Sequence, residues 1–336
     1  MPGLKPKSET YPRGRAARDA WIVARRDGIG RTEGLSPRRP SHWLREWEPD
    51  PAGGQASILT IFLTNRECPW RCLMCDLWRH TLETTVPPGA IPEQVEAAFA
   101  ADRASHPDRA RWLKLYNAGS FFDPQAIPRK DLPELALKAR SFERLVVECH
   151  PSLVREKATL PFRDQLGSGT RLELAIGLET AHPGVLERLN KGIDLESFRR
   201  SAEWIRSHGM DLRVFVLVKP PFLGETEALE WARRSIDFAF DCGADTVSLI
   251  PTRKGNGALE WLEARGQFSP PQPETLEAAL AHGLRLRRGR VFADTWDLDR
   301  READPIRRES LRARIEESNR TQRAMDSVAD AGEETG

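Results

Sequence analysis

The chain has 336 residues, of which 39% are hydrophobic and 30% are charged, and its formal net charge is +1. This composition is that of a somewhat polar globular protein. No apolar run approaches the roughly 20 residues of a membrane span, and the first residues lack the apolar core of a secretory signal. Five cysteines, three of them clustered, form no disulfide framework and indicate a reducing compartment. We therefore expect a cytoplasmic protein that makes no membrane contact.

The first 56 residues are interpreted as a basic extension that precedes the folded core. Residues 1–48 contain eleven Lys or Arg and six Asp or Glu. Arginine pairs can bind phosphates through bidentate hydrogen bonds, so they are candidate contacts for an anionic partner. The alternative is that arginine is abundant throughout this sequence and that these side chains only face solvent. The pairs in question are Arg25-Arg26, Arg38-Arg39 and Arg287-Arg288.

Frequent proline and glycine in this extension allow only short helices. We predict a helix over residues 16–26 and a short helical turn, capped by Ser41, that runs through Trp47. The aromatic residues Trp21, Trp43 and Trp47 indicate that the extension packs against the rest of the chain. The first few residues are expected to be disordered.

Beyond residue 56, apolar β-rich runs alternate with helical patterns. The predicted strands are 57–64, 112–117, 144–149, 171–179, 212–218 and 245–250. The predicted helices between them are 91–101, 129–140, 183–189, 195–208 and 226–241. Such alternation favours parallel βα units over a sandwich. We therefore predict an α/β fold, a partial (β/α)6 TIM-like barrel over residues 57–265, followed by a C-terminal helical extension over 266–326 and a disordered tail over 327–336.

The loop after the first predicted strand carries three cysteines within eight residues. Cys68, Cys72 and Cys75 form a CxxxCxxC array. Three thiolates can hold three irons of a cubane cluster and leave the fourth iron open to a small molecule. A structural zinc site is the alternative, with His80 or the Cys149-His150 pair supplying a fourth ligand. Structural zinc motifs usually show paired CxxC spacings, which this array lacks.

Polar or glycine-containing turns follow several of the later strands. Asn117-Ala118-Gly119-Ser120 follows the second strand, where glycine would let a ligand approach the backbone closely. Glu179 ends the fourth strand, Lys219 follows the fifth and Pro251 follows the sixth. Because barrels place active sites at the C-terminal ends of their strands, we expect these residues to lie near the cysteines. Ordinary βα turns and helix caps are the alternative for each of them.

The CxxxCxxC spacing resembles that of the radical S-adenosylmethionine (SAM) enzymes. The segments YNAGSFFDP, VVECHPSLV, LAIGLETAHPGVLERLNKG and FVLVKPPFLGETEA resemble, in order and spacing, the radical SAM subunit of archaeosine synthase. This resemblance implies a [4Fe-4S] cluster on the three cysteines, S-adenosyl-L-methionine at its open iron, and reductive cleavage of SAM to a 5'-deoxyadenosyl radical. Where the family often has an aromatic residue before the third cysteine, this chain has Met74, whose thioether can also pack on adenine. The SAM contacts that the resemblance implies are Met74, Asn117, Ala118, Gly119, Ser120, Glu179, Lys219 and Pro251.

The same resemblance implies a modified tRNA nucleoside as substrate, with cleavage of a carbon–nitrogen bond, a flavodoxin- or ferredoxin-type electron donor and a partner subunit. A small-molecule or peptide substrate on the same scaffold is the alternative. A zinc-stabilised nucleic-acid-binding protein without catalysis is a more distant one. The Cys149-His150-Pro151 run departs from the SRPE-like run of the family, so any role of that run in SAM or substrate binding does not carry over. Cys149 and Cys242 are expected to be structural.

Overall fold

The computed structural model describes residues 10–296, 298 and 304–325. Its centre is one eight-stranded sheet in which neighbouring strands follow one another in chain order. The first strand pairs antiparallel with the second, and all the other neighbouring pairs are parallel. The strands are β1 (His42–Pro49), β2 (Gln55–Leu63), β3 (Trp112–Asn117), β4 (Arg144–Cys149), β5 (Arg171–Glu179), β6 (Asp211–Val218), β7 (Thr246–Pro251) and β8 (Arg290–Ala293).

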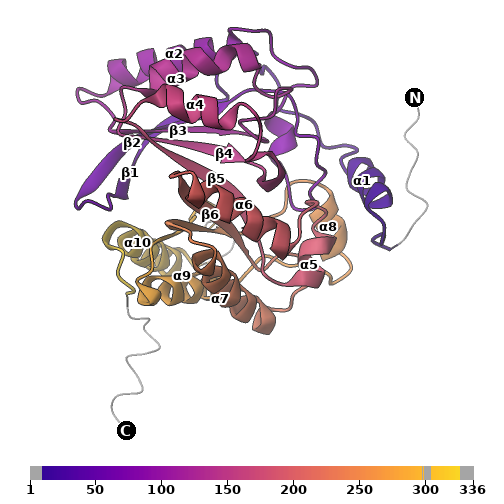
Figure 1. Ribbon diagram of the computed structural model, residues 1–336. Helices are drawn as coiled ribbons and strands as arrows, with labels where there is room; N and C mark the ends of the chain where they lie inside the picture. The colour runs from indigo at the N-terminus through magenta and orange to yellow at the C-terminus, as the bar shows by residue number, and fades with distance from the viewer. Residues whose placement is uncertain (1–9, 297, 299–303, 326–336) are drawn as a thin grey trace.

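Helices connect the parallel strands and cover the outer face of the sheet (Figure 1). Pro183, Pro273 and Pro305 each occupy the first turn of a helix, where the missing N–H of proline costs no hydrogen bond. The α-helices are α1 (Arg15–Ala24), α2 (Ala90–Ser105), α3 (Leu132–Ala139), α4 (Thr159–Leu166), α5 (Pro183–Arg188), α6 (Leu195–Ser207), α7 (Glu225–Asp241), α8 (Ala258–Glu263), α9 (Pro273–Leu286) and α10 (Pro305–Thr321). The short 3-10 helices η1 (Leu77–His80), η2 (Arg129–Asp131) and η3 (Pro151–Leu153) lie within the described residues.

The sheet is curled, so that its first and last strands approach each other. In a flat sheet, strands spaced by about 4.8 Å would place β1 and β8 roughly 34 Å apart. Arg290 Nη1 of β8 nevertheless lies 3.3 Å from Glu48 Oε2 of β1. Helix α10 also packs against both strands. The predicted partial TIM-like barrel is therefore confirmed, with an antiparallel strand added at one edge.

Side chains of each strand alternate between an outer and an inner face of the curl. The outer positions are apolar and at most 1% exposed, as for Leu115, Val147, Ile176, Val214 and Val247. They form one core with the surrounding helices. Parallel strands covered by helices must bury this face, which is why it reads as valine, isoleucine and leucine. The inner positions carry charged side chains near the strand starts and aromatic ones further along.

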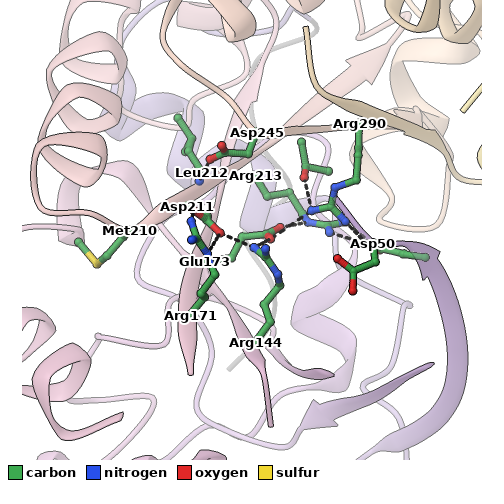
Figure 2. A network of polar contacts seen from close by, with 12 residues as sticks. Asp50, Arg144, Arg171, Glu173, Met210, Asp211, Leu212, Arg213, Asp245 and Arg290 are labelled. Atoms are coloured by element: carbon green, nitrogen blue, oxygen red, sulfur yellow. Dashed lines mark hydrogen bonds and ion pairs between the residues drawn. The ribbon is translucent and has the colours of Figure 1, made fainter. Parts of the chain in front are cut away.

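A network of charged side chains fills the inner face at the N-terminal ends of the strands, as Figure 2 shows. Glu173 accepts hydrogen bonds from Arg144 and Arg213, each at 2.7 Å, and Arg213 binds Glu48 at 2.7 Å. Burial alone would raise the pKa of Glu48, but Arg213 and two further cations outweigh burial and hold this pKa below its ordinary value. We term this network the ionic floor. Its members are Lys114, Arg144, Arg213, Arg290, Glu46, Glu48, Glu173 and Asp211.

The end of α10 covers the outer edge of β8. Gln322 accepts a hydrogen bond from the Val291 N–H at 2.8 Å and donates to the Val291 carbonyl at 2.9 Å. Asn319 does the same with Ala293, at 2.9 Å in both directions. The two side-chain amides therefore pair the backbone groups that the last strand turns away from the sheet.

All six predicted strands are present, as β2 to β7, and so are the predicted helices between them. The helical turn predicted through Trp47 is wrong, because residues 42–49 form β1. Trp43, Arg45 and Trp47 alternate with residues of the opposite face, a period of two that suits a strand paired with β2. Trp21 is buried, as predicted for the extension, whereas Trp47 is 58% exposed, so its predicted packing is wrong.

The sequence pattern predicts neither α4 nor β8, which are short and carry few periodic apolar positions. The disorder predicted for the first few residues and for the tail falls outside the described residues. β1 and β8 belong to the same sheet although they come from the two predicted extensions. The proposed division into extensions and core stays a prediction.

Within the described residues, no helix combines the length and apolarity that a membrane crossing requires.

Candidate functional site

The loop that carries the three cysteines lies directly after β2, at the C-terminal edge of the sheet. Its first residue is held by Gln94 of α2, whose amide pairs with both the N–H and the carbonyl of Thr64 at 2.8 Å. Its far end is held by Asn256, which donates to the Leu73 carbonyl at 2.7 Å and to the Cys75 carbonyl at 3.3 Å. Helix α2, which precedes β3, and the segment after β7 therefore fix the path of this cysteine loop.

The thiols of Cys68, Cys72 and Cys75 are half-buried and free. Burial raises the pKa of each thiol to about 12, and the nearby Lys191 ammonium acts in the opposite direction on Cys68 and Cys72. Thiols in such an environment stay protonated until a metal deprotonates them on binding. This set of soft, closely spaced sulfur donors is of the kind that iron–sulfur clusters use.

The described residues contain no group of three His, Cys, Asp or Glu side chains that converges on one ion position. A cubane cluster takes one thiolate per iron, so its ligands surround the cluster and do not converge on one point. His150, one of the fourth ligands considered for zinc, accepts a hydrogen bond from Ser152 N–H at 3.2 Å and bonds the Lys191 carbonyl at 3.1 Å. Its ring stacks on Trp70, with the ring centroids 3.6 Å apart. The donor set therefore fits a cluster better than tetrahedral zinc.

The turn after β3 lies against the cysteine loop, as its sequence predicts. A Cβ atom on Gly119 would lie 3.3 Å from Cys68 Cβ, so glycine permits this close approach. Asn117 is 3% exposed, and within the described part of the chain neither atom of its amide has a hydrogen-bond partner. Leaving a buried polar group unpaired costs about 1–3 kcal/mol. A ligand that offers a donor and an acceptor would remove that cost.

The other two residues of this turn differ in their contacts. Ala118 is half-buried, while Ser120 is buried and bonds to the end of β4. The Ser120 hydroxyl lies 3.3 Å from Cys149 Sγ and accepts a hydrogen bond from His150 N–H at 3.2 Å. Ser120 therefore fixes the turn to β4, and Cys149 is buried behind it.

A buried ion pair between Glu179 and Lys191 lies at the end of β5. Glu179 has a φ of +68°, in the left-handed region that side chains rarely adopt. A Cβ atom on Gly177 would overlap both Glu179 Oε1 and Lys191 Nζ, so the pair occupies the space that this glycine leaves. Burial alone would lower the pKa of Lys191, but Glu179 outweighs burial and raises it above its ordinary value.

Glu148 is a site residue that sequence reasoning misses. It lies at the inner side of β4, where it is half-buried, and its carboxylate accepts a hydrogen bond from Asn117 N–H at 3.3 Å. Burial raises the pKa of Glu148 to about 8, and the charge of Glu179 acts in the same direction. A carboxylate directly after the apolar residues 145–147 is the signal that could have identified it. Its partner groups come from other strands, so no local pattern reveals them.

Three further predicted SAM contacts occupy different surroundings. Met74 is half-buried and packs against two apolar clusters beside the loop. Lys219 is 5% exposed and binds Glu225 and Ser269, the latter at 2.8 Å, so its ammonium is engaged within the chain. Pro251 ends β7 and is buried. The structure thus places Met74 and the turn after β3 beside the cysteine loop, whereas Lys219 contacts the segment before α9.

Helix α1 of the N-terminal extension packs on the outside of the cysteine loop (Figure 1). Trp21 contacts the apolar cluster that includes Leu73, and its ring lies edge-on to Trp261 at 5.0 Å. Asn190 donates to Asp19 of α1 at 2.7 Å and to a loop carbonyl at 2.8 Å. The extension therefore supports the loop.

Three arginines of the predicted pairs also have carboxylate partners, namely Arg26 with Glu67, Arg38 with Glu93 and Arg288 with Asp241.

A cavity of about 330 Å³ flanks the cysteine loop on its outer side. Its lining includes Glu67 and Pro69, the two neighbours of Cys68, together with the basic side chains of Arg31, Arg66 and Arg71. Pro69 is exposed. Solvent therefore approaches the backbone of Cys68 from outside the sheet.

No family model matches the chain. The chain is 28% identical over 228 residues to archaeosine synthase subunit beta of Methanosarcina acetivorans, a match that covers 65% of this chain and 64% of that protein. It is 30% identical over 164 residues to archaeosine synthase subunit beta of Thermococcus kodakarensis, covering 47% and 50%. A solved structure of methylornithine synthase (PylB) is similar with a TM-score of 0.49 at 12% identity, over 85% of this chain and 73% of that one.

The chain thus spans less than two thirds of the length of these curated relatives. The matches to the archaeosine synthase subunits agree with the resemblance inferred from the cysteine spacing and from the motifs after the strands. The chain is a relative of the radical SAM enzymes, and among them of the archaeosine synthase β subunits.

Proposed function

We propose that the chain is an enzyme that cleaves SAM reductively at a [4Fe-4S] cluster held by Cys68, Cys72 and Cys75. When bound, the cluster would supply the electron that splits the sulfonium of SAM and leaves a 5'-deoxyadenosyl radical. The observation that carries the proposal is the placement of Cys68, the first residue of the three-cysteine array, against a turn whose buried Asn117 amide has no hydrogen-bond partner among the described residues. That arrangement supplies cluster ligands and a vacant hydrogen-bonding position side by side.

The polar groups of the strand ends would then bind and orient SAM. The Asn117 amide would pair with the amino and carboxylate groups of the methionyl moiety, and Gly119 would keep the backbone clear for it. Glu179, fixed by Lys191, would accept hydrogen bonds from the ribose or the amino group. The Met74 thioether would pack on the adenine.

Anaerobic reconstitution with iron and sulfide tests the proposal. The chain should bind about four irons per molecule, as one [4Fe-4S] cluster requires. With SAM and dithionite it should release 5'-deoxyadenosine and methionine, which chromatography quantifies. Binding of one zinc per chain without 5'-deoxyadenosine would contradict the proposal and favour a zinc-stabilised protein.

For the substrate we propose a modified nucleoside in tRNA, with cleavage of a carbon–nitrogen bond. The support is the name of the relatives, archaeosine synthase subunit beta, together with the basic N-terminal extension. Binding to tRNA should weaken steeply with salt, because neutralised phosphates release counterions. Filter binding at low and moderate salt measures this dependence. Absence of tRNA binding even at low salt would count against RNA and favour a small-molecule or peptide substrate.

The relatives are named as β subunits, so we also propose a partner subunit for this chain. A flavodoxin- or ferredoxin-type electron donor would approach the cysteine loop from its outer side, where Pro69 is exposed and the cavity lining is rich in arginine. The five free cysteines support a reducing, cytoplasmic setting. Co-purification from the native source and reduction of the cluster by added flavodoxin would test the two partners separately.

A further inference from the structure

Four aromatic side chains face into the curl above the ionic floor: Phe62 of β2, Tyr116 of β3, Phe215 of β6 and Phe292 of β8. We term them the inner aromatic face. The ring centroids of Tyr116 and Phe215 lie 6.2 Å apart, although β3 and β6 are three strands apart in the sheet. Only side chains that point into the curl can meet across it. Phe62 lies 6.2 Å from Tyr116.

Phe292 adjoins the floor directly. The guanidinium groups of Arg213 and Arg290 lie 5.6 Å and 5.8 Å from the centre of its ring. The inner aromatic face therefore forms the next layer above the charged network, on the side toward the cysteine loop.

The four rings are only half-buried, although they lie on the inside of the sheet. On the same strands, the outer residues Leu115 and Val214 are at most 1% exposed. Packing within the chain thus covers one side of each strand completely and leaves the aromatic side accessible. An uncovered group of large apolar side chains in a folded protein is commonly a binding surface.

Polar groups lie around these rings. The Tyr116 hydroxyl makes no hydrogen bond to any described residue, and burial raises its pKa to about 12, so it stays a donor at neutral pH. Ser248 is half-exposed and lies in register between Phe215 and Phe292. Glu148 is half-buried at the end of β4, hydrogen-bonded to the backbone that follows Tyr116. The accessible surface therefore combines flat apolar faces with a few hydrogen-bonding groups.

We propose that the inner aromatic face binds a planar heteroaromatic ring of the nucleobase class by stacking, with the Tyr116 hydroxyl and the Glu148 carboxyl at its polar edge. The inference deepens the proposed function and rests on it, because it assigns the substrate's ring to this surface. Aromatic side chains stack on any base, and hydrogen bonds to the base edge then select among bases. A purely aliphatic substrate would leave the Tyr116 hydroxyl without a partner, whereas the edge of a base offers it one.

Binding of 2-aminopurine riboside to the reconstituted protein tests this assignment, since stacking quenches the fluorescence of that base. The wild-type chain should quench it saturably. Phe215→Leu and Tyr116→Leu should each weaken binding roughly tenfold or more, the scale of one lost stacking contact. Tyr116→Phe, which removes only the hydroxyl, should weaken binding about three- to tenfold. Phe215→Tyr keeps a stacking ring and should bind nearly as the wild type does.

The matched control is Phe238→Leu, the same substitution at a half-buried phenylalanine on α7, outside the curl. It should bind the probe as the wild type does. Thermal unfolding of each variant separates loss of binding from loss of folding. A wild-type chain that releases 5'-deoxyadenosine from SAM but does not quench the probe would overturn the inference and leave the proposed function standing. Equal binding by Phe215→Leu and the wild type would also overturn it.

Discussion

The two ends of the curled sheet are built on opposite principles. At the ionic floor, every charged side chain has an oppositely charged partner, and all its members except Glu46 are nearly closed to solvent. At the C-terminal edge, the Asn117 amide has no hydrogen-bond partner among the residues that the structure describes, and neither do Thr64 Oγ1 and Asn65 Oδ1. The first arrangement uses polar groups to hold strands together. The second keeps polar groups available, which is what a ligand site needs.

Backbone conformation shows the same difference. Six described non-glycine residues have positive φ, and four of them lie at the end of β5 or in the segments after β5 and β6: Glu179, Asn190, Lys219 and Phe222. The other two are C-caps of α9 and α10. Such conformations cost about 1–3 kcal/mol each and persist where the surroundings enforce them, commonly at functional sites. Substitutions at the two ends should therefore separate stability from activity.

The largest effect is expected at the edge. Cys72→Ala should abolish the iron–sulfur absorbance and the release of 5'-deoxyadenosine, because the cluster would lose one of its three thiolates. Cys242→Ala is the control, since Cys242 is buried at the end of α7, away from the loop. Iron content and product release measure both variants. Normal iron content in Cys72→Ala would remove this cysteine from the ligand set.

At the floor, Arg213→Ala should lower the free energy of unfolding by about 3–5 kcal/mol, because it removes a buried cation that pairs with both Glu48 and Glu173. The exposed pair of Arg200 with Glu196 provides the control, and Arg200→Ala should cost less than about 1 kcal/mol. Urea unfolding measures both. A variant at Arg213 that kept its stability but lost SAM cleavage would break the distinction between the two ends.

Asn117→Ala should weaken SAM binding about tenfold to a hundredfold, the scale of hydrogen bonds to charged groups. Its free energy of unfolding should stay equal or rise, because the change removes an unpaired buried amide. Asn319→Ala is the matched control, since both atoms of that amide are bonded to Ala293. It should lose stability and keep SAM affinity. Equilibrium dialysis with SAM and urea unfolding together distinguish the two asparagines.

The last effect concerns Glu148 and depends on pH. The unfolded chain releases this proton near the ordinary pKa of 4.5, whereas the folded chain keeps it until about pH 8. The contribution of Glu148 to the free energy of unfolding is therefore fully present below about pH 4.5 and falls as pH rises toward 8. The slope is at most about 1.4 kcal/mol per pH unit. In Glu148→Gln this part of the slope should vanish, which urea unfolding across that pH range would show.

The groups that face Glu148 are the Asn117 N–H, the Lys191 ammonium and the Glu179 carboxylate. They are the same in both proteins, so the difference between wild type and variant isolates Glu148. Identical pH dependence in the two proteins would mean that Glu148 titrates near its ordinary pKa and is more accessible than its packing indicates.

The barrel strands and the cysteine loop could be predicted from the sequence alone, and the reasons are physical. Strand runs such as RLVVEC are rich in apolar residues because helices cover parallel strands, and the spacing of Cys68, Cys72 and Cys75 needs no distant partner. The pairing of Glu179 with Lys191 depends on the left-handed turn at Glu179, which no local pattern predicts. That the Asn117 amide lacks a partner is likewise a result of packing. Such features exist only after distant segments have come together.

The side-chain amides on β8 also determine how this sheet can associate. An open edge strand offers unpaired backbone groups to any strand of another molecule. Gln322 and Asn319 satisfy those of Val291 and Ala293 as a ninth strand would, yet they present no new backbone edge of their own. Helix α10 therefore works as a terminator of sheet growth, and its C-terminal turn protects the molecule against edge-to-edge aggregation.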